Sequence, residues 1–108
     1  MNDVSIVGRF VKPIEVKDFG QEKCVINNVV AVGRRRKSEA GQNADFIPVT
    51  IWGKTARVVE KYCQKGNMIG LSGRLSSRQY DSSDGKHHFV VEMVVEDVHL
   101  VEGKRFLD

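Results

Sequence analysis

The chain has 108 residues, of which 41% are hydrophobic and 29% are charged, and its formal net charge is +3. This length fits one compact domain and is too short for two ordinary ones, so we expect a single domain over residues 1–103 and a disordered end over residues 104–108. No apolar run reaches the roughly 18 residues of a membrane span, and the first ten residues lack the basic and apolar regions of a signal peptide, which predicts a cytoplasmic protein without a membrane partner.

Strand patterns fill the first part of the chain. Residues 4–11 alternate between apolar and polar positions, and Pro13 ends the pattern. A turn around residues 18–21 precedes a second strand over residues 24–32, which is rich in β-branched side chains. The polar, glycine-containing stretch RRRKSEAGQNAD, residues 34–45, predicts a long mobile loop before the next strand.

The heptapeptide FIPVTIW, residues 46–52, has two faces of different character. Its aliphatic side chains Ile47, Val49 and Ile51 share one face, which we assign to the core. The opposite face then carries Phe46, Pro48, Thr50 and Trp52. Because proline has no N–H to donate to a ladder, we expect an edge, a bulge or a gap in pairing at Pro48.

Residues 55–65 change to a helical period. Apolar side chains recur at i, i+3 and i+7, which predicts an amphipathic helix of about three turns. Thr55 is placed to cap its N-terminus, and Gly66 is placed to end it as the C′ residue. This is the only helix that we expect in the chain.

The last two strands are predicted to form a long hairpin. Alternation returns over residues 68–80 and 88–100, and the Asp84-Gly85 pair between them has turn chemistry. The resulting order of three strands, one helix and two strands predicts an all-β protein. It matches the OB-fold, a five-stranded Greek-key barrel with one helix between strands 3 and 4 and a long hairpin of strands 4 and 5.

Cysteine and histidine usage predicts no metal site. Cys24 and Cys63 lie far apart, form no CxxC pair and have no set of zinc ligands near them, so we expect two free thiols, buried or half-buried. His87, His88 and His99 lack carboxylates or thiols at ligand spacing. We therefore expect neither a metal nor any other cofactor.

Aromatic rings and cations share the predicted outer face, and residues 31–80 carry ten basic but only three acidic side chains. The outer-face set comprises Phe46, Thr50, Trp52, Arg74, Arg78 and Tyr80, joined by Lys54 and by the loop residues Arg34, Arg35, Arg36 and Lys37. Such a surface suits single-stranded nucleic acid, because unpaired bases stack on flat rings while Arg and Lys neutralise the phosphates. Each part also has another interpretation. Trp52 packs on the helix or fills a subunit interface, Phe46 caps a barrel end, Tyr80 is an ordinary cross-strand partner near the hairpin tip, and the loop cations are solvated.

The sequence resembles the bacterial single-stranded-DNA-binding protein (SSB) family over residues 2–102. The stretches that carry the resemblance are VSIVGRFVKPIEV, NNVVAVGR, ADFIPVTIWGKTARVVEKYCQKGNMIGLSGRL, SRQYDSSDGK and VVEMVVEDVHLVE. By this resemblance, the stacking aromatics fall on Phe46, Trp52 and Tyr80, and the phosphate contacts fall on Arg34, Lys54, Lys65, Arg74 and Arg78. A further family position that is often aromatic falls near Arg36, and arginine can stack as well.

The resemblance also implies a function and an assembly. It implies largely sequence-independent binding and protection of single-stranded DNA in replication, recombination or repair, at the nucleoid. It implies a homotetramer, a dimer of dimers in which the first strand pairs across an interface. Family members usually end in a disordered tail whose acidic tip recruits other enzymes, whereas this chain ends at EGKRFLD, so we expect a short form without that tip.

Two other functions fit parts of the pattern. An RNA-binding or primosome-type adaptor would use the same OB-fold. An enzyme would need acids paired with a nucleophile or a metal set. The candidate acids form no such pairing; they are Asp45, Asp81, Asp84, Glu92 and Glu96. We therefore expect a binding protein without enzymatic activity.

Overall fold

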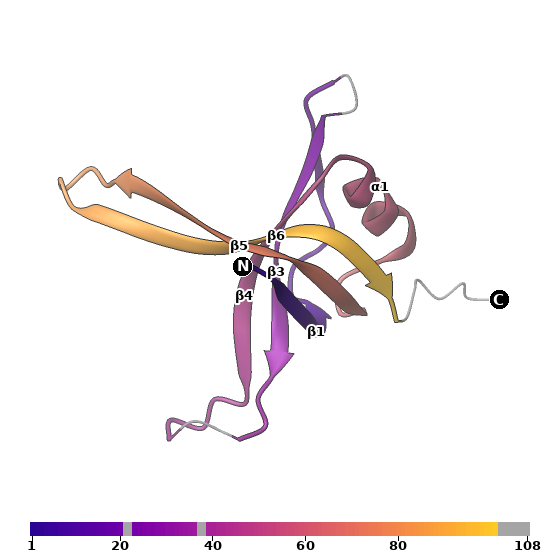
Figure 1. The fold of residues 1–108 in the computed structure, drawn as a ribbon, viewed down its shortest axis with the longest axis horizontal. Coiled ribbons are helices and arrows are strands. Elements are labelled where there is room, and N and C mark those ends of the chain that lie inside the picture. The colour runs from indigo at the N-terminus through magenta and orange to yellow at the C-terminus, as the bar shows by residue number, and fades with distance from the viewer. Residues whose placement is uncertain (21–22, 37–38, 102–108) are drawn as a thin grey trace.

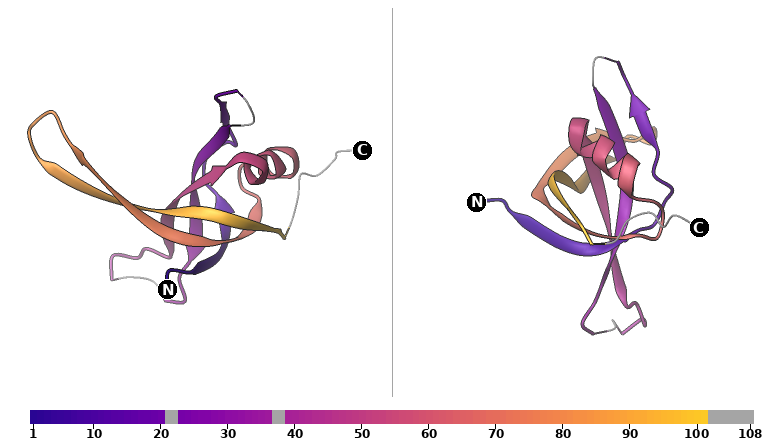
Figure 2. Two further views of the ribbon diagram at one scale, coloured as in Figure 1. Left: turned by 45° about the horizontal axis from the view of Figure 1, so that its top comes forward. Right: turned by 90° about the vertical axis from the view of Figure 1, so that its right-hand side faces the viewer.

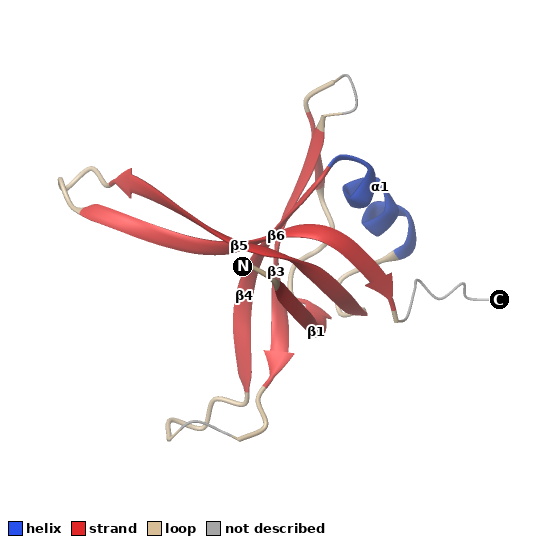
Figure 3. Cartoon of the chain, in the orientation of Figure 1, coloured by secondary structure: helices blue, strands red, loops and turns tan. Residues whose placement is uncertain are grey.

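The computed structural model describes residues 1–20, 23–36 and 39–101, and within them it contains six strands and one helix (Figures 1 and 3). The elements are β1 (Val4–Phe10), β2 (Val16–Asp18), β3 (Cys24–Gly33), β4 (Ala44–Trp52), α1 (Gly53–Tyr62), β5 (Met68–Asp81) and β6 (His87–Leu100). The all-β class and the order of the five long strands around one helix are confirmed. The sequence did not predict β2, because three residues are too few to show an alternation.

The strands form one sheet that closes on itself in a ring. Its order is β1-β5-β6-β4-β3-β2, and β1 closes the ring by pairing with β3 at Arg9–Ala31 and Phe10–Val30. Gly8 permits this closure, since a Cβ atom there would lie 2.4 Å from the carbonyl oxygen of Ala31. The β4–β6 pair is parallel, and the other pairs are antiparallel. This closed sheet, together with helix α1, is the OB-fold that the sequence predicts.

The core lies inside the closed sheet. As expected, the aliphatic face of β4 points into it. Val49 and Ile51 are buried and Ile47 is half-buried, and they pack with apolar side chains of β1, β3, β5 and β6. Helix α1 adds Ala56 and Val59, which are fully buried. Figure 2 shows α1 on the side of the body opposite the tip of the β5–β6 hairpin, so the helix covers the core without covering the hairpin.

The predicted ends of the helix are wrong. α1 begins at Gly53, with extended Trp52 as its N-cap and no side-chain cap, so Thr55 lies inside the first turn. The φ angle of Gly53 is 61°, a left-handed value that favours glycine and turns the chain from β4 into the helix. At the other end the helix stops before Cys63, which is extended because its side chain enters the core. Gly66 therefore belongs to the following turn and is not the C′ residue.

Pro48 lies at a gap in hydrogen bonding, although the β3–β4 ladder itself is continuous. It stands opposite Val29 in the β3–β4 ladder, and the carbonyl of Val29 accepts a hydrogen bond at 2.9 Å from the N–H of Val11, on the side away from β4. The Val29–Pro48 pair is therefore one of the pairs that exchange no hydrogen bonds. On the other side of β4, the ladder with β6 begins one residue later, at Val49. The missing N–H of Pro48 consequently breaks neither ladder.

Three connections project from the ring in different directions. In Figure 1 the β5–β6 hairpin extends to the left, the β2–β3 connection points upward and the β3–β4 connection points downward. The predicted hairpin turn is confirmed: Gly85 has a φ of 84°, and the N–H of Lys86 donates to Oδ1 of Asp84 at 3.1 Å. The long loop between β3 and β4 is also present. Residues 37–38 of this loop, and the end of the chain for which we predict disorder, lie outside the described residues.

Candidate nucleic-acid interface

Three exposed rings stand where the sequence predicts them. Phe46 and Trp52 lie near the two ends of β4, and 58% and 52% of their surfaces are exposed. Tyr80, near the outer end of β5, is 50% exposed. The alternation of β4 explains the first two, because the intervening aliphatic residues turn into the core. All three rings can be reached by a ligand from solvent.

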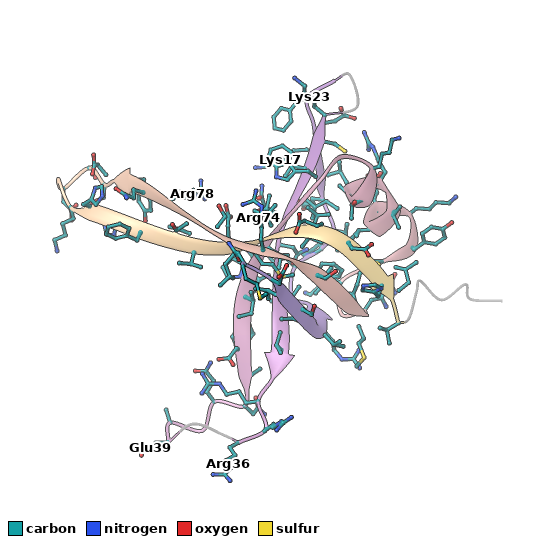
Figure 4. The ribbon with its side chains drawn as sticks, viewed as in Figure 1. Lys17, Lys23, Arg36, Glu39, Arg74 and Arg78 are labelled. Carbon is teal, nitrogen blue, oxygen red and sulfur yellow. The ribbon has the colours of Figure 1, made fainter. Side chains whose placement is uncertain are left out.

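A hollow of about 440 Å³ lies beside Trp52, and we call it the central groove. The lining residues come from all five strands from β2 to β6 and from the turn after β2. They are Lys17, Phe19, Val25, Asn27, Thr50, Trp52, Arg78 and Glu92. We call the projecting β2–β3 and β5–β6 strand pairs arms, and Figure 4 shows Lys17 on the first and Arg78 on the second. The groove thus combines a large ring with cations from two different arms, which is the combination that a stacked base and its phosphates need.

The central groove also contains a polar network. Thr50 is only 6% exposed; its hydroxyl donates to Oε2 of Glu92 at 3.0 Å and lies 3.4 Å from Oδ1 of Asn27. The other carboxylate oxygen, Oε1 of Glu92, lies 3.9 Å from Nε of Arg78. The structure therefore places Thr50 beneath the surface as an anchor for Glu92, and direct contact between Thr50 and nucleic acid stays a prediction. Glu92 brings a negative charge to a groove in which we expect phosphates.

Tyr80 is paired with a ring that the sequence analysis did not select. His88 lies opposite it in the β5–β6 register, and the two rings stack with centroids 5.0 Å apart and planes at 17°. Nε2 of His88 lies 3.1 Å from Oγ of Ser82, which orients the imidazole. One face of Tyr80 is therefore covered by His88, and a base can stack only on the opposite face.

The cations of the β3–β4 loop differ in their pairing. Nε and Nη2 of Arg34 both donate to Oδ1 of Asp45, at 2.9 and 2.6 Å, so a phosphate must compete with this carboxylate for Arg34. Arg35 and Arg36 are exposed, and Figure 4 shows Arg36 far from the body of the ring. Lys37, a predicted binding residue, lies outside the described residues.

The remaining predicted cations, Lys54, Arg74 and Lys65, do not gather at one place. Lys54 follows Trp52 closely, in the first turn of α1, and Figure 4 shows Arg74 at the centre of the body. Lys65 follows the opposite end of α1, a helix of ten residues that spans about 15 Å. The structure therefore does not bring Lys65 together with Trp52.

Comparison with known proteins identifies the family. A model of the Single-strand binding protein family matches residues 1–101. The chain belongs to this family. It is 42% identical to single-stranded DNA-binding protein 1 of Clostridium acetobutylicum, over 97% of each chain. It is also 34% identical to single-stranded DNA-binding protein B of Bacillus subtilis, over 95% of this chain and 92% of that one. The resemblance seen in the sequence is confirmed.

Sequence reasoning missed several residues of this Single-strand binding protein family member that lie in the central groove or beside Tyr80. Lys17 lies in the short strand β2, and Phe19 lies in the turn after it, where no alternation assigns a face. Asn27 and His88 become visible only through their cross-strand partners, Thr50 and Tyr80. A signal for these two exists in the sequence, but reading it requires the register of the strands.

This Single-strand binding protein family member has two cysteines. Cys24 and Cys63 are buried free thiols, as predicted. Over residues 1–20, 23–36 and 39–101, no group of three or more His, Cys, Asp or Glu is arranged to hold a metal ion. Within that part of the chain, no helix has the length and apolar character needed to cross a membrane.

Proposed function

We propose that the chain binds single-stranded DNA largely without regard to sequence. The observation that carries this proposal is Trp52, a half-exposed ring on the wall of a groove that also contains Lys17 and Arg78. Stacking on such a ring contributes ~1–3 kcal/mol per base and tolerates any sequence, because every base has a π face. Phe46 and Tyr80 supply further stacking surfaces, and the exposed cations neutralise phosphates. The names of the relatives, single-stranded DNA-binding proteins, support the same class of ligand.

The proposed role is protective and not enzymatic. We propose that residues 1–103 act as one DNA-binding domain, which covers single strands in the bacterial cytoplasm during replication, recombination or repair. Membership of the Single-strand binding protein family supports this role.

We also propose that the chain assembles as a homotetramer, a dimer of dimers. β1 pairs with β5 from Val4 to Arg9 but with β3 only at Arg9 and Phe10, so within the described part of the chain one edge of its first half has no strand partner. Val7 on this half is exposed. A free strand edge with an exposed apolar side chain favours pairing with a second chain. Light scattering should give four times the mass of one chain, and a monomer at the concentrations used for DNA binding would contradict the assembly.

The decisive experiment is a titration of the purified protein with oligo-dT. Trp52 is the only tryptophan, so its fluorescence reports directly on the central groove. We expect quenching at low salt, and log K that falls with log salt concentration by about 0.7 per phosphate contact on a single strand. Absence of quenching, or equal affinity for duplex DNA, would refute the proposal. A preference for RNA of matched sequence over DNA would instead support the RNA-binding alternative.

A further inference from the structure

Phe19 is an exposed ring that the predicted site does not include. It lies in the turn after β2, and 65% of its surface is exposed. Single exposed apolar residues are normal on a protein surface, so exposure alone does not indicate a role. The position of Phe19 does, because it lines the central groove together with Trp52 and also lines a second hollow beside it.

The second hollow has a different chemistry from the central groove. It has a volume of about 510 Å³ and is lined by Phe19, Lys23, Cys24, Trp52 and Gly53. Because Cys24 is buried and donates its thiol to the carbonyl of Gly53 at 3.3 Å, the surface that remains is formed chiefly by two aromatic rings and the Lys23 side chain. Phe19 and Trp52 are therefore common to both hollows, and the second hollow offers a largely apolar surface that suits a flat apolar group.

The turn that carries Phe19 is held in place from two sides. The N–H of Phe19 donates to the carbonyl of Lys23 at 2.8 Å. The carboxylate of Asp18 accepts from the N–H of Gly20 at 2.9 Å and forms an ion pair with Arg57 of α1. Arg57 thereby neutralises the acid beside Phe19, and the backbone that carries Phe19 is held before a ligand arrives, which lowers the entropy lost on binding.

The charges around Phe19 match a nucleic acid better than an apolar peptide. Lys17 lines the central groove on one side of Phe19, and Lys23 lines the apolar hollow on the other. Figure 4 shows both lysines on the β2–β3 arm. A nucleotide strand presents flat apolar bases that alternate with negative phosphates, so a pair of rings with a cation on each side is complementary to it.

We infer that Phe19 and Trp52 are the two walls of one base-binding slot, in which Lys17 and Lys23 hold the neighbouring phosphates. The inference rests on the proposed function and deepens it, because it carries the path of the bound strand from β4 onto the β2–β3 arm. It assigns Phe19 a role in binding that strand alternation alone does not reveal.

A double-mutant cycle tests whether the two rings share a base. Affinity for a fluorescein-labelled oligo-dT is measured by anisotropy for the wild-type chain, Phe19→Ala, Trp52→Ala and the double variant. Each single change should weaken binding by about 5- to 150-fold, the equivalent of one stack of ~1–3 kcal/mol. The double variant should lose much less than the product of the two single losses, because removing either wall already opens the slot.

Three further variants separate stacking from other effects. Phe89→Ala is the matched control, since Phe89 is 68% exposed but alternates onto the opposite face of the β5–β6 hairpin from Tyr80; its affinity should equal that of the wild type. Phe19→Leu keeps apolar bulk without a flat ring and should bind as weakly as Phe19→Ala. Lys17→Gln should reduce the salt dependence of log K by about 0.7, whereas Phe19→Ala should leave it unchanged.

The outcomes distinguish this inference from the proposed function. If the wild type binds oligo-dT and Phe19→Ala binds as tightly, the slot is refuted while the function stands. Multiplicative losses in the cycle would also refute it, since they would place the two rings on different bases. A wild-type chain that does not bind oligo-dT refutes both. The melting temperature of each variant should equal that of the wild type, because the substituted side chains are exposed.

Discussion

Replacing Glu92 by glutamine should strengthen the binding of single-stranded DNA. Glu92 is an acid in the central groove, where its two oxygens meet Thr50 and Arg78. Glutamine has nearly the same shape, and its amide oxygen can still accept the hydrogen bond of Thr50. The change therefore removes one negative charge and releases Arg78 from its ion pair, while the polar network below the groove is kept.

The size of the gain follows from Coulomb's law. A phosphate about 6 Å from the carboxylate is repelled by about 0.7 kcal/mol at the dielectric constant of water and by about 3 kcal/mol at an effective value of 20. The lost attraction between Glu92 and Arg78 adds little to this, because the distance is 3.9 Å and 70% of the arginine side chain is exposed. Removing the charge should thus tighten binding by about 3- to 100-fold at low salt.

The assay is the Trp52 fluorescence titration at three or more salt concentrations. The affinity of Glu92→Gln should exceed that of the wild type, and the difference should shrink as salt screens the groove. Glu96→Gln is the matched control, because Glu96 is an exposed acid of the same strand that does not line the central groove. Unchanged or weaker binding by Glu92→Gln in a protein with an unchanged melting temperature would show that phosphates do not approach this groove.

Three other perturbations test the stacking surface of Phe46, the closure of the sheet at Gly8 and the carboxylate of Asp18. Phe46→Ala should weaken oligo-dT binding by ~1–3 kcal/mol without lowering the melting temperature, because Phe46 is 58% exposed; a loss of stability would place its ring in the core. Gly8→Ala should shift the urea midpoint downward by the equivalent of about 1–3 kcal/mol, since the added Cβ would meet the Ala31 carbonyl at 2.4 Å; an unchanged midpoint would mean that β1 does not close the ring there. The pKa of Asp18 lies below its ordinary value of 3.8, chiefly because of the Gly20 backbone hydrogen bond, so its contribution to stability is present above pH 3.8 and is lost as pH falls through the lower folded value. The melting temperature of the wild type should therefore exceed that of Asp18→Asn at neutral pH, and the gap should close in acid; a gap that persists at the lowest pH would contradict this account.

Strand alternation was sufficient to predict much of the fold and part of the site. In β4 the contrast between Val49 and Ile51 on one side and Phe46 and Trp52 on the other is a direct consequence of period two, and it needs no tertiary information. The same argument placed Tyr80 outward on β5. Phe46 and Trp52 could be found because the opposite face of β4 is strongly apolar, and Tyr80 because it continues the outward positions of β5.

Alternation failed where the outer face is itself covered. Thr50 belongs to the outward set of β4, yet Glu92 of β6 lies against it, so the side chain is 6% exposed. The parallel β4–β6 pairing that creates this contact joins segments far apart in the sequence, and no local pattern encodes it. His88 was missed for a different reason, since its stacking on Tyr80 depends on the exact register of the predicted hairpin, which alternation alone does not fix. Phe19 was missed because turn residues have no period to assign them a face.

The spacing of the rings argues for an extended path rather than a single pocket. Phe46 and Trp52 are six residues apart on one strand, which separates their backbones by about 20 Å, so they cannot stack on the same base. Tyr80 and Phe19 lie on arms that Figure 1 shows pointing in different directions from the ring. A bound strand that reaches every ring must therefore change direction across the body, with the central groove near its middle. A short oligomer held in that groove should be insensitive to Phe46→Ala, and sensitivity should appear only when the oligomer is long enough to follow β4.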